Sequence, residues 1–186
     1  MTKKTNERVT VAGFGGQGVM LLGQILAYAG NETNKKTLWY PSYGPETRGG
    51  TANCAVIISD DDINSPVFQK ANTVIAMNLP SLEKFYTKVR DDGNIIYNSS
   101  LIKNKEITTK AKVYKVPAND LAIELGNSRV ANVITLGAYL EITKIFKDEV
   151  ILAILKKLLG EEKQHLLDIN QKALQVGRNY IKKEYC

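Results

Sequence analysis

A glycine-rich segment near the amino terminus is the first pattern with a chemical meaning. Gly13, Gly15 and Gly18 have the spacing G-x-G-x-x-G and lie between a short β-branched stretch and an apolar one. Glycines at this spacing let the backbone turn tightly and approach a ligand, and the free N–H groups at the start of a following helix favour an anion. The spacing therefore predicts a binding loop. Its other candidate residues are Phe14, Gly16 and Gln17.

This loop lacks the partner that a dinucleotide site requires. Nicotinamide and flavin sites place an acidic residue about 20 positions further on, at the end of the second strand, to bind the ribose. Here that strand ends in Leu38-Trp39-Tyr40-Pro41, and Glu32 precedes it in a turn. No Gly-Lys-Ser/Thr follows the glycines, so a lysine-bearing phosphate loop is absent. A free-standing nucleotide-binding protein and a tight turn without a ligand both stay open as alternatives.

A second candidate site is the loop from Pro41 to Gly50, which is dense in residues that prevent regular structure. Arg48 would suit a carboxylate or phosphate through paired hydrogen bonds, and Glu46 could orient Arg48 or accept a donor from a partner. Simple pairing of these two side chains across a turn is the alternative. The candidates in this loop are Ser42, Tyr43, Gly44, Pro45, Glu46, Arg48, Gly49 and Gly50.

Short strands alternate with helices along the chain, and this order must position both loops. A helix is predicted from Val19 to Ala29, closed by Gly30, and Pro80-Ser81 begins another. The strands are predicted at 8–12, 37–40, 52–58, 73–77, 93–97 and 112–116. The C-terminal helices are predicted at 130–146 (capped by Asn127 or Ser128), 148–159 (capped by Asp148, stopped by Gly160) and 161–183. We predict one α/β domain over 1–186, with three layers, a mostly parallel sheet and a helical C-terminal third.

Both loops follow predicted strands, as do Asn78 and the turn at 98–100. In parallel sheets, ligands and partners gather at the carboxyl ends of the strands. If these strands are parallel, their polar groups converge on one edge of the sheet. This edge offers no nucleophile–base pair and no metal cluster, so we expect it to bind a ligand or partner and not to break bonds.

The composition argues against several other functions. The net charge is +6, but the lysines are scattered and lack the interleaved aromatics or arginine clusters of a nucleic-acid site. The chain has two cysteines, too few for a four-thiolate cluster, and we interpret Cys54 as a small buried hydrophobe. No apolar run reaches the ~18 residues of a membrane span, and a polar N-terminus leads us to expect a cytoplasmic protein.

At these residues the sequence resembles the gamma subunit of 2-oxoacid:ferredoxin oxidoreductases. The resemblance lies in five segments that follow one another over most of the chain, at 13–19, 42–54, 76–82, 97–100 and 132–138. The form Ser-Tyr-Gly-Pro-Glu-x-Arg-Gly-Gly-Thr-Ala-Asn-Cys is most similar to the 2-oxoglutarate type. The 2-oxoisovalerate type has similar gamma subunits and is the alternative.

The resemblance implies a role within a complex. Members of this family decarboxylate a 2-oxoacid on thiamine diphosphate, pass electrons through iron–sulfur clusters to ferredoxin or a related acceptor, and release an acyl-CoA. It implies that these cofactors lie mainly on alpha, beta and often ferredoxin-like delta subunits, and that this chain alone holds none and is inactive. Its two loops would lie on the coenzyme A side, or serve only in packing between subunits. An exposed partner surface would also allow homodimers in isolation.

Overall fold

The computed structural model describes residues 4–42, 52–103 and 105–185. Its centre is a six-stranded sheet in the order β2-β3-β1-β4-β5-β6. The strands are β1 (Asn6–Gly13), β2 (Lys36–Ser42), β3 (Ala52–Ser59), β4 (Ala71–Ala76), β5 (Val89–Asn98) and β6 (Lys112–Val116). Strand β3 runs antiparallel to its neighbours β1 and β2, whereas β1, β4, β5 and β6 pair in parallel. The mostly parallel sheet is therefore confirmed.

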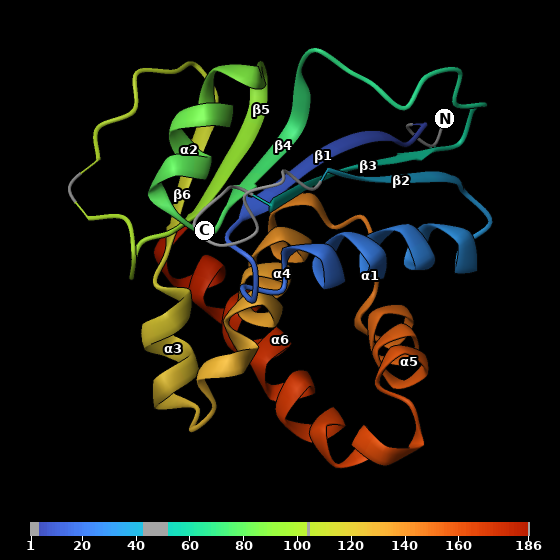
Figure 1. Cartoon of the computed structure of the whole chain (residues 1–186), viewed down its shortest axis with the longest axis vertical. Helices are drawn as coiled ribbons and strands as arrows, with labels where there is room; N and C mark the ends of the chain where they lie inside the picture. The colour runs from blue at the N-terminus through green and yellow to red at the C-terminus, as the bar shows by residue number, and fades with distance from the viewer. Residues whose placement is uncertain (1–3, 43–51, 104, 186) are drawn as a thin grey trace.

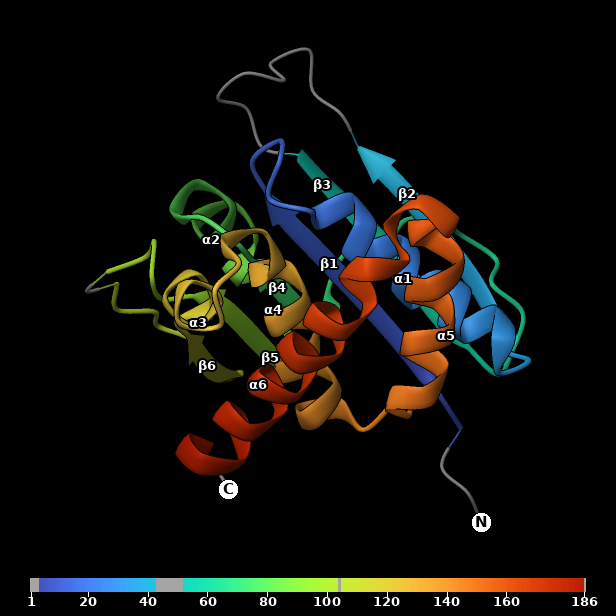
Figure 2. The same cartoon turned by 90° about the horizontal axis from the view of Figure 1, so that it is seen from below.

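Helices cover the sheet unequally. Most lie on one side of it, and α2 lies on the other (Figures 1 and 2). The first group comprises α1 (Val19–Glu32), α3 (Ala118–Glu124), α4 (Ala131–Thr143), α5 (Asp148–Leu159) and α6 (Leu167–Tyr185), and the second is α2 (Leu79–Phe85). Short 3-10 turns are formed by Tyr86–Lys88, Ser128–Val130 and Glu161–Leu166. This arrangement confirms the predicted α/β class with a helical C-terminal third.

The side chains of β1 alternate between the two faces of the sheet, and both faces are buried under other elements. Val9 and Val11 belong to the larger core beneath α1 and α4, whereas Ala12 belongs to a smaller core with Leu82 and Phe85 of α2. Successive side chains of a strand point to opposite faces, so a strand buried on both sides reads as an apolar run. The segment Val9-Thr10-Val11-Ala12 has this character.

Several predicted helix boundaries are wrong. The helix predicted at 130–146 ends at Thr143, where Lys144 is left-handed, and the helix predicted from 161 begins with a 3-10 turn and becomes α-helical at Leu167. Two further predicted boundaries also differ. Gly30 does not end α1, because it lies within the helix where a Cβ would overlap Thr37 of the neighbouring strand. The helix closes instead at Thr33, whose hydroxyl donates to the carbonyl of Ala29 at 2.9 Å. Asp148 does not cap α5: it is the first residue of the helix, after Lys147, and its carboxylate binds Arg178. Gly160 ends α5 as predicted.

The central helix α4 is buried from Ala131 to Glu141, between the sheet and α6. It meets α6 at two glycines. A Cβ on Gly137 would overlap the carbonyl oxygen of Leu174, and a Cβ on Gly177 would overlap that of Ile134. The two backbones are therefore as close as glycine alone permits.

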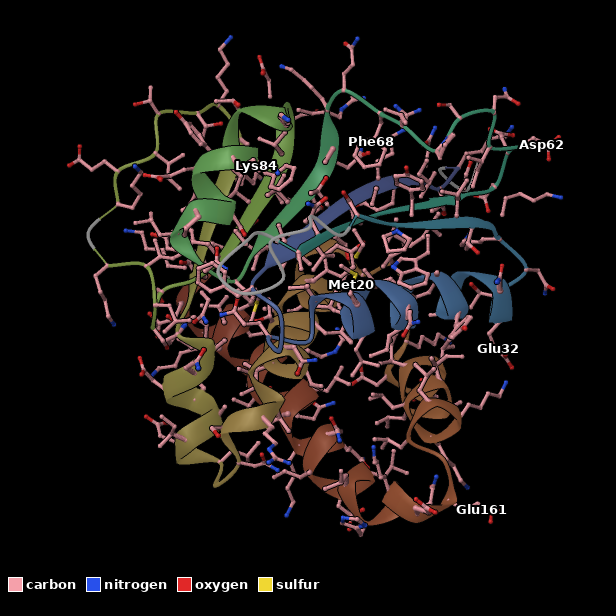
Figure 3. The ribbon with its side chains drawn as sticks, viewed as in Figure 1. Met20, Glu32, Asp62, Phe68, Lys84 and Glu161 are labelled. Carbon is pink, nitrogen blue, oxygen red and sulfur yellow. The ribbon has the colours of Figure 1, made fainter. Side chains whose placement is uncertain are left out.

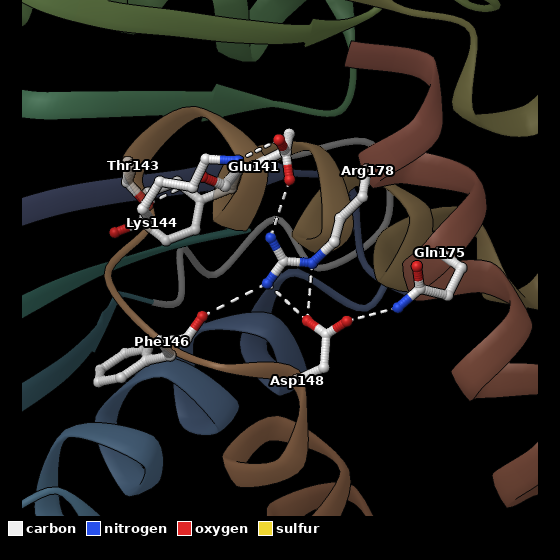
Figure 4. A network of polar contacts seen from close by, with 8 residues as sticks. Glu141, Thr143, Lys144, Phe146, Asp148, Gln175 and Arg178 are labelled. Carbon is white, nitrogen blue, oxygen red and sulfur yellow. Dashed lines mark hydrogen bonds and ion pairs between the residues drawn. The ribbon is translucent and has the colours of Figure 1, made fainter. Parts of the chain in front are cut away.

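A buried ion-pair network closes the far end of this seam (Figure 4). The Arg178 guanidinium, 10% exposed, donates to Glu141 at 3.1 Å, to Asp148 at 2.7 Å and to the carbonyl of Phe146 at 3.3 Å. Glu141 also pairs with Lys144. Burial raises the pKa of Glu141, but the hydrogen bonds from Lys144 and Arg178 outweigh burial and hold the pKa below its usual value.

The outer edge of β6 is closed by the C-terminal helix. The Tyr185 hydroxyl accepts a hydrogen bond from the Lys115 N–H at 2.8 Å and donates to the Lys115 carbonyl at 3.4 Å. The Tyr185 ring also packs on Tyr114, with 5.0 Å between ring centroids. One side chain thus satisfies both groups that Lys115 presents to the edge of the sheet.

Glu7 is a half-buried acid at the opposite end of β1 from the glycine loop. Its carboxylate accepts from the Thr73 hydroxyl at 2.8 Å and from the Tyr139 hydroxyl at 3.5 Å. Burial raises the pKa of Glu7 to about 7, although these hydrogen bonds oppose the shift. Folding therefore makes Glu7 easier to protonate than it is in the unfolded chain.

We expect Glu7→Gln to stabilise the protein at pH 8 and to have little effect at pH 5. Because the folded pKa is raised, the contribution of Glu7 to stability is fully present below about pH 4.5 and is lost as pH rises through about 7. The neutral amide avoids this loss, for a gain of about 2 kcal/mol at pH 8. Thermal unfolding at both pH values measures it, with the exposed Glu124→Gln as control. An equal effect at both pH values would contradict the assignment.

Candidate functional site

The predicted convergence at one sheet edge is confirmed for the described residues. The glycine loop follows β1, Ser42 ends β2, Asn78 follows β4 and Asn98 ends β5. The strand register brings these ends together, since Gly13 pairs with Ala52, Ser42 with Asn53 and Ala12 with Ala76. We call this the carboxyl edge. The other candidates of the second loop, Tyr43, Gly44, Pro45, Glu46, Arg48, Gly49 and Gly50, lie outside the described residues.

The glycine loop requires glycine at two of its positions. Gly16 and Gly18 have φ angles of 89° and 73°, in the left-handed region that side-chain-bearing residues rarely adopt. Gly15 and Gly16 are exposed, and a Cβ on Gly16 would meet nothing within 4 Å. Gly18 begins α1 with no side-chain cap and no acidic residue in the first turn. The tip of the loop is therefore open, and the helix N-terminus beside it carries no competing negative charge.

Gln17 and Asn78 hold this loop to the neighbouring strand end. Gln17 Oε1 accepts from the Phe14 N–H at 2.7 Å and from Asn78 Nδ2 at 3.1 Å. Gln17 Nε2 donates to the Met77 carbonyl at 3.3 Å, and Asn78 Oδ1 caps α2 by accepting from the Ser81 N–H at 2.9 Å. Both amides are thus engaged within the protein, and their role in the described structure is to position the loop.

Asn132 is a residue of this site that we did not predict. It lies in the first turn of α4, is 7% exposed, and its Nδ2 is 3.4 Å from the Gly18 carbonyl. A Cβ on Gly18 would overlap the Asn132 amide, so Gly18 leaves room for this side chain. In the sequence, this role was indicated only by a lone asparagine in the otherwise apolar 130–134 segment. Its partner is 114 positions away.

The turn after β5 is bound to α3. Asn98 is fully buried, donates to Asn119 Oδ1 at 2.7 Å, and accepts from the Ser100 N–H at 3.3 Å. Ser100 Oγ accepts from the Asp120 N–H at 3.0 Å. These side chains therefore shape the carboxyl edge by fixing the start of α3.

Cys54 is confirmed as a small buried hydrophobe. It is fully buried, and its thiol donates to the Val19 carbonyl at 3.6 Å. Burial raises the pKa of this thiol to about 11, which the nearby Trp39 indole offsets only in part, so it stays protonated at neutral pH. A protonated, inaccessible thiol does not act as a nucleophile.

The described residues of the carboxyl edge offer two kinds of polar group. They present backbone N–H groups at an open glycine tip and amides that are committed to shaping the loops. Within 4–42, 52–103 and 105–185, no three His, Cys, Asp or Glu side chains gather to hold a metal ion. None of the helices in these ranges is long and apolar enough to cross a membrane.

Comparison with known proteins connects this geometry to one family. The family model described as pyruvate ferredoxin/flavodoxin oxidoreductase matches residues 8–180. The ketoisovalerate oxidoreductase subunit VorA of Methanothermobacter marburgensis is 38% identical over 180 residues, covering 95% of this chain and 37% of the relative. The 2-oxoglutarate synthase subunit KorC of Methanocaldococcus jannaschii is 31% identical over 169 residues, covering 88% of this chain and 90% of the relative. This chain thus spans little more than a third of the VorA relative.

Two solved structures share the fold. The gamma subunit of a keto/oxoacid ferredoxin oxidoreductase from Geobacter sulfurreducens has a TM-score of 0.80 at 26% identity, over 95% of this chain and 99% of that one. A 2-oxoglutarate:ferredoxin oxidoreductase from Magnetococcus marinus, with 2-oxoglutarate, coenzyme A and succinyl-CoA bound, has a TM-score of 0.87 at 21% identity. This second match covers 97% of this chain and 32% of the other, and it concerns the fold alone.

Proposed function

Because the chain belongs to the pyruvate ferredoxin/flavodoxin oxidoreductase family, we propose that it is the gamma subunit of a complex that oxidises a 2-oxoacid to an acyl-CoA. Electrons would leave to ferredoxin or a related acceptor. The observation that carries the role of this chain is the carboxyl edge, where an open glycine tip, a helix N-terminus and fixed amides converge and the described residues include no reactive pair.

The redox and decarboxylation chemistry is proposed to lie on partner subunits. Two cysteines cannot supply the four thiolates of a usual cluster, and Cys54 is buried as a neutral thiol. Thiamine diphosphate and iron–sulfur clusters would therefore be held by alpha, beta and delta-type chains. The isolated gamma chain is accordingly expected to be inactive.

Coenzyme A is the ligand that we propose for the carboxyl edge in the assembled complex. The Magnetococcus structure of similar fold contains coenzyme A and succinyl-CoA. The exposed Gly15-Gly16 tip, followed by the uncapped N-terminus of α1, fits an anionic group such as a phosphate. When bound, coenzyme A supplies the thiol that accepts the acyl group. The residues of this chain would only bind and orient it.

Two observations point to different 2-oxoacids. The 42–54 motif is most similar to the 2-oxoglutarate type, which we propose as the substrate. The VorA relative nevertheless has the higher identity, 38% against 31% for KorC, and this favours 2-oxoisovalerate as a second candidate. The two acids differ at the far end from the 2-oxo group, where one has a carboxylate and the other has two methyl groups. Their kcat/KM values should therefore differ clearly.

Anaerobic purification of the tagged chain from its own cells tests the proposal. We expect co-purification of chains that carry thiamine diphosphate and clusters, and coenzyme A-dependent oxidation with the highest kcat/KM on 2-oxoglutarate. In that complex, Arg48→Ala is expected to raise the apparent KM for coenzyme A by about tenfold, as loss of one charge-assisted contact would. A loss of assembly in place of a KM effect would favour a purely architectural role. A chain recovered alone and binding nucleotide would overturn the proposal.

A further inference from the structure

The sheet has a second surface that the carboxyl edge does not include. Over β2 and β3, the face opposite α1 is covered by no described helix, and the 60–70 segment is the only described part of the chain that crosses it (Figure 1). Figure 3 shows Phe68 of this segment on the opposite side of the sheet from Met20 of α1. We call this surface the outer face and define it by Arg8, Tyr40, Ala55, Val67 and Phe68.

The outer face contains an apolar groove. A cavity of about 220 Å³ is lined mainly by apolar residues, among them Tyr40, Ala55, Val67, Phe68 and Phe85, and polar side chains that include Lys88 complete the lining. Two of these side chains are unusually exposed for apolar residues, Tyr40 at 52% and Val67 at 72%. Contiguous exposed apolar side chains around a groove are typical of interaction surfaces.

The exposed valine is held in place by its own loop. Ser65 Oγ accepts from the Val67 N–H at 3.1 Å and donates to the Val67 carbonyl at 3.2 Å. This double contact fixes the backbone that presents Val67. A side chain presented in this way loses little conformational freedom when a partner covers it.

A cation without a partner borders the groove. The half-buried Arg8 side chain lines the adjoining cavities together with Val67 and Phe68, and within the described residues its guanidinium has no hydrogen bond or ion pair. Its cationic neighbours are paired, Lys35 with Asp60 at 2.7 Å and Arg90 with Asp92 at 3.0 Å. Asp62 and Asp91 also line these cavities, but neither forms an ion pair with Arg8. A half-buried guanidinium is best satisfied by a carboxylate that bonds to it directly.

We propose that the outer face docks a segment of a partner subunit that inserts an apolar side chain beside Val67 and Tyr40 and presents a carboxylate to Arg8. This inference rests on the proposed function, because it requires a partner subunit. The length of the VorA relative is consistent with it, since the matching region there is 37% of one longer chain. In such a chain, other polypeptide is tethered to this domain.

Co-expression with the partner subunits tests the proposal. We expect Val67→Asp and Arg8→Glu each to reduce recovery of the partners on the tagged chain at least tenfold. Ile123→Asp is the matched control, because Ile123 is 64% exposed and lies on α3, on the other side of the sheet. Ser65→Ala should weaken recovery to a smaller extent. Unfolding curves of each isolated chain would show that the variants fold.

The outcomes separate the surface from the proposed function. If Val67→Asp and Arg8→Glu recover the partners as well as the wild type does, the docking surface is wrong and the proposed function stands. A wild-type chain that recovers no partners would overturn the proposed function and the docking proposal together. Light scattering of the isolated chain tests whether a second copy of this chain occupies the groove. A dimer that Val67→Asp converts to a monomer would overturn the proposed partner chemistry.

Discussion

Gly177→Ala is expected to lower the free energy of unfolding by about 3 kcal/mol, a large share of the stability of a domain of this size. The new methyl group would overlap the carbonyl oxygen of Ile134 in the buried helix α4. Relief requires a shift of one helix backbone against the other, because no flexible side chain can move out of the way. Gly137→Ala should act similarly through Leu174.

The expected loss of stability is opposite in sign to the usual effect of replacing glycine by alanine in a helix, so the two explanations can be distinguished. In an exposed helix, replacing glycine by alanine is favourable by up to about 1 kcal/mol. The control is Asn179→Ala, an exposed position two residues further along the same helix, where we expect a change within about 0.5 kcal/mol. Urea unfolding measures all three variants. A Gly177→Ala protein as stable as the wild type would show that the two helices are further apart than described.

Arg178→Met is the second large effect that we expect, with a loss of about 3 kcal/mol. Methionine keeps most of the apolar volume but leaves Glu141, 5% exposed, without its buried guanidinium partner. Asp148 loses its partner at the same time and retains the contact from Gln175. The cost comes from buried negative charge that keeps only its contacts with Lys144 and Gln175, and not from a cavity.

A second substitution distinguishes these causes. Glu141→Gln combined with Arg178→Met removes the buried charge and should recover part of the lost stability, measured by denaturant unfolding at pH 7. Because the pKa of Glu141 is lowered in the fold, the network stabilises above the usual carboxyl pKa and is lost as pH falls through the folded one. Lys144 still lowers the pKa of Glu141 when Arg178 is absent, so the acid dependence of the Arg178→Met protein should be weaker than that of the wild type. A double variant no more stable than the single one would indicate that packing dominates.

Local patterns predicted most of the fold. The β-branched runs, Pro80 in the first turn of α2, and Gly160 after α5 all act over a few residues, and each lies where expected. The resemblance to gamma subunits of 2-oxoacid:ferredoxin oxidoreductases is also confirmed. Coenzyme A binding at the predicted loop residues stays a prediction.

Contacts between distant segments were not predictable in the same way. Gln17 and Asn78 were expected to face a ligand, yet they bind each other across 61 positions, because β1 and β4 are neighbours in the sheet. Asp148 has the residue type of a helix cap, but Arg178, 30 positions later, binds its carboxylate. In each case local preference gave way to the need to satisfy a buried polar group.

The contact of Tyr185 with β6 makes the two edge strands of the sheet unequal as sites for pairing with a strand of another molecule. An unpaired edge strand is a template for intermolecular strand pairing and aggregation. At β6, one phenol occupies the N–H and the carbonyl of Lys115 that an incoming strand would use. At β2, no described side chain forms such a contact. Intermolecular β-pairing of this protein should therefore begin at β2, and fibrils grown from it should keep the Tyr185 end of the sheet free.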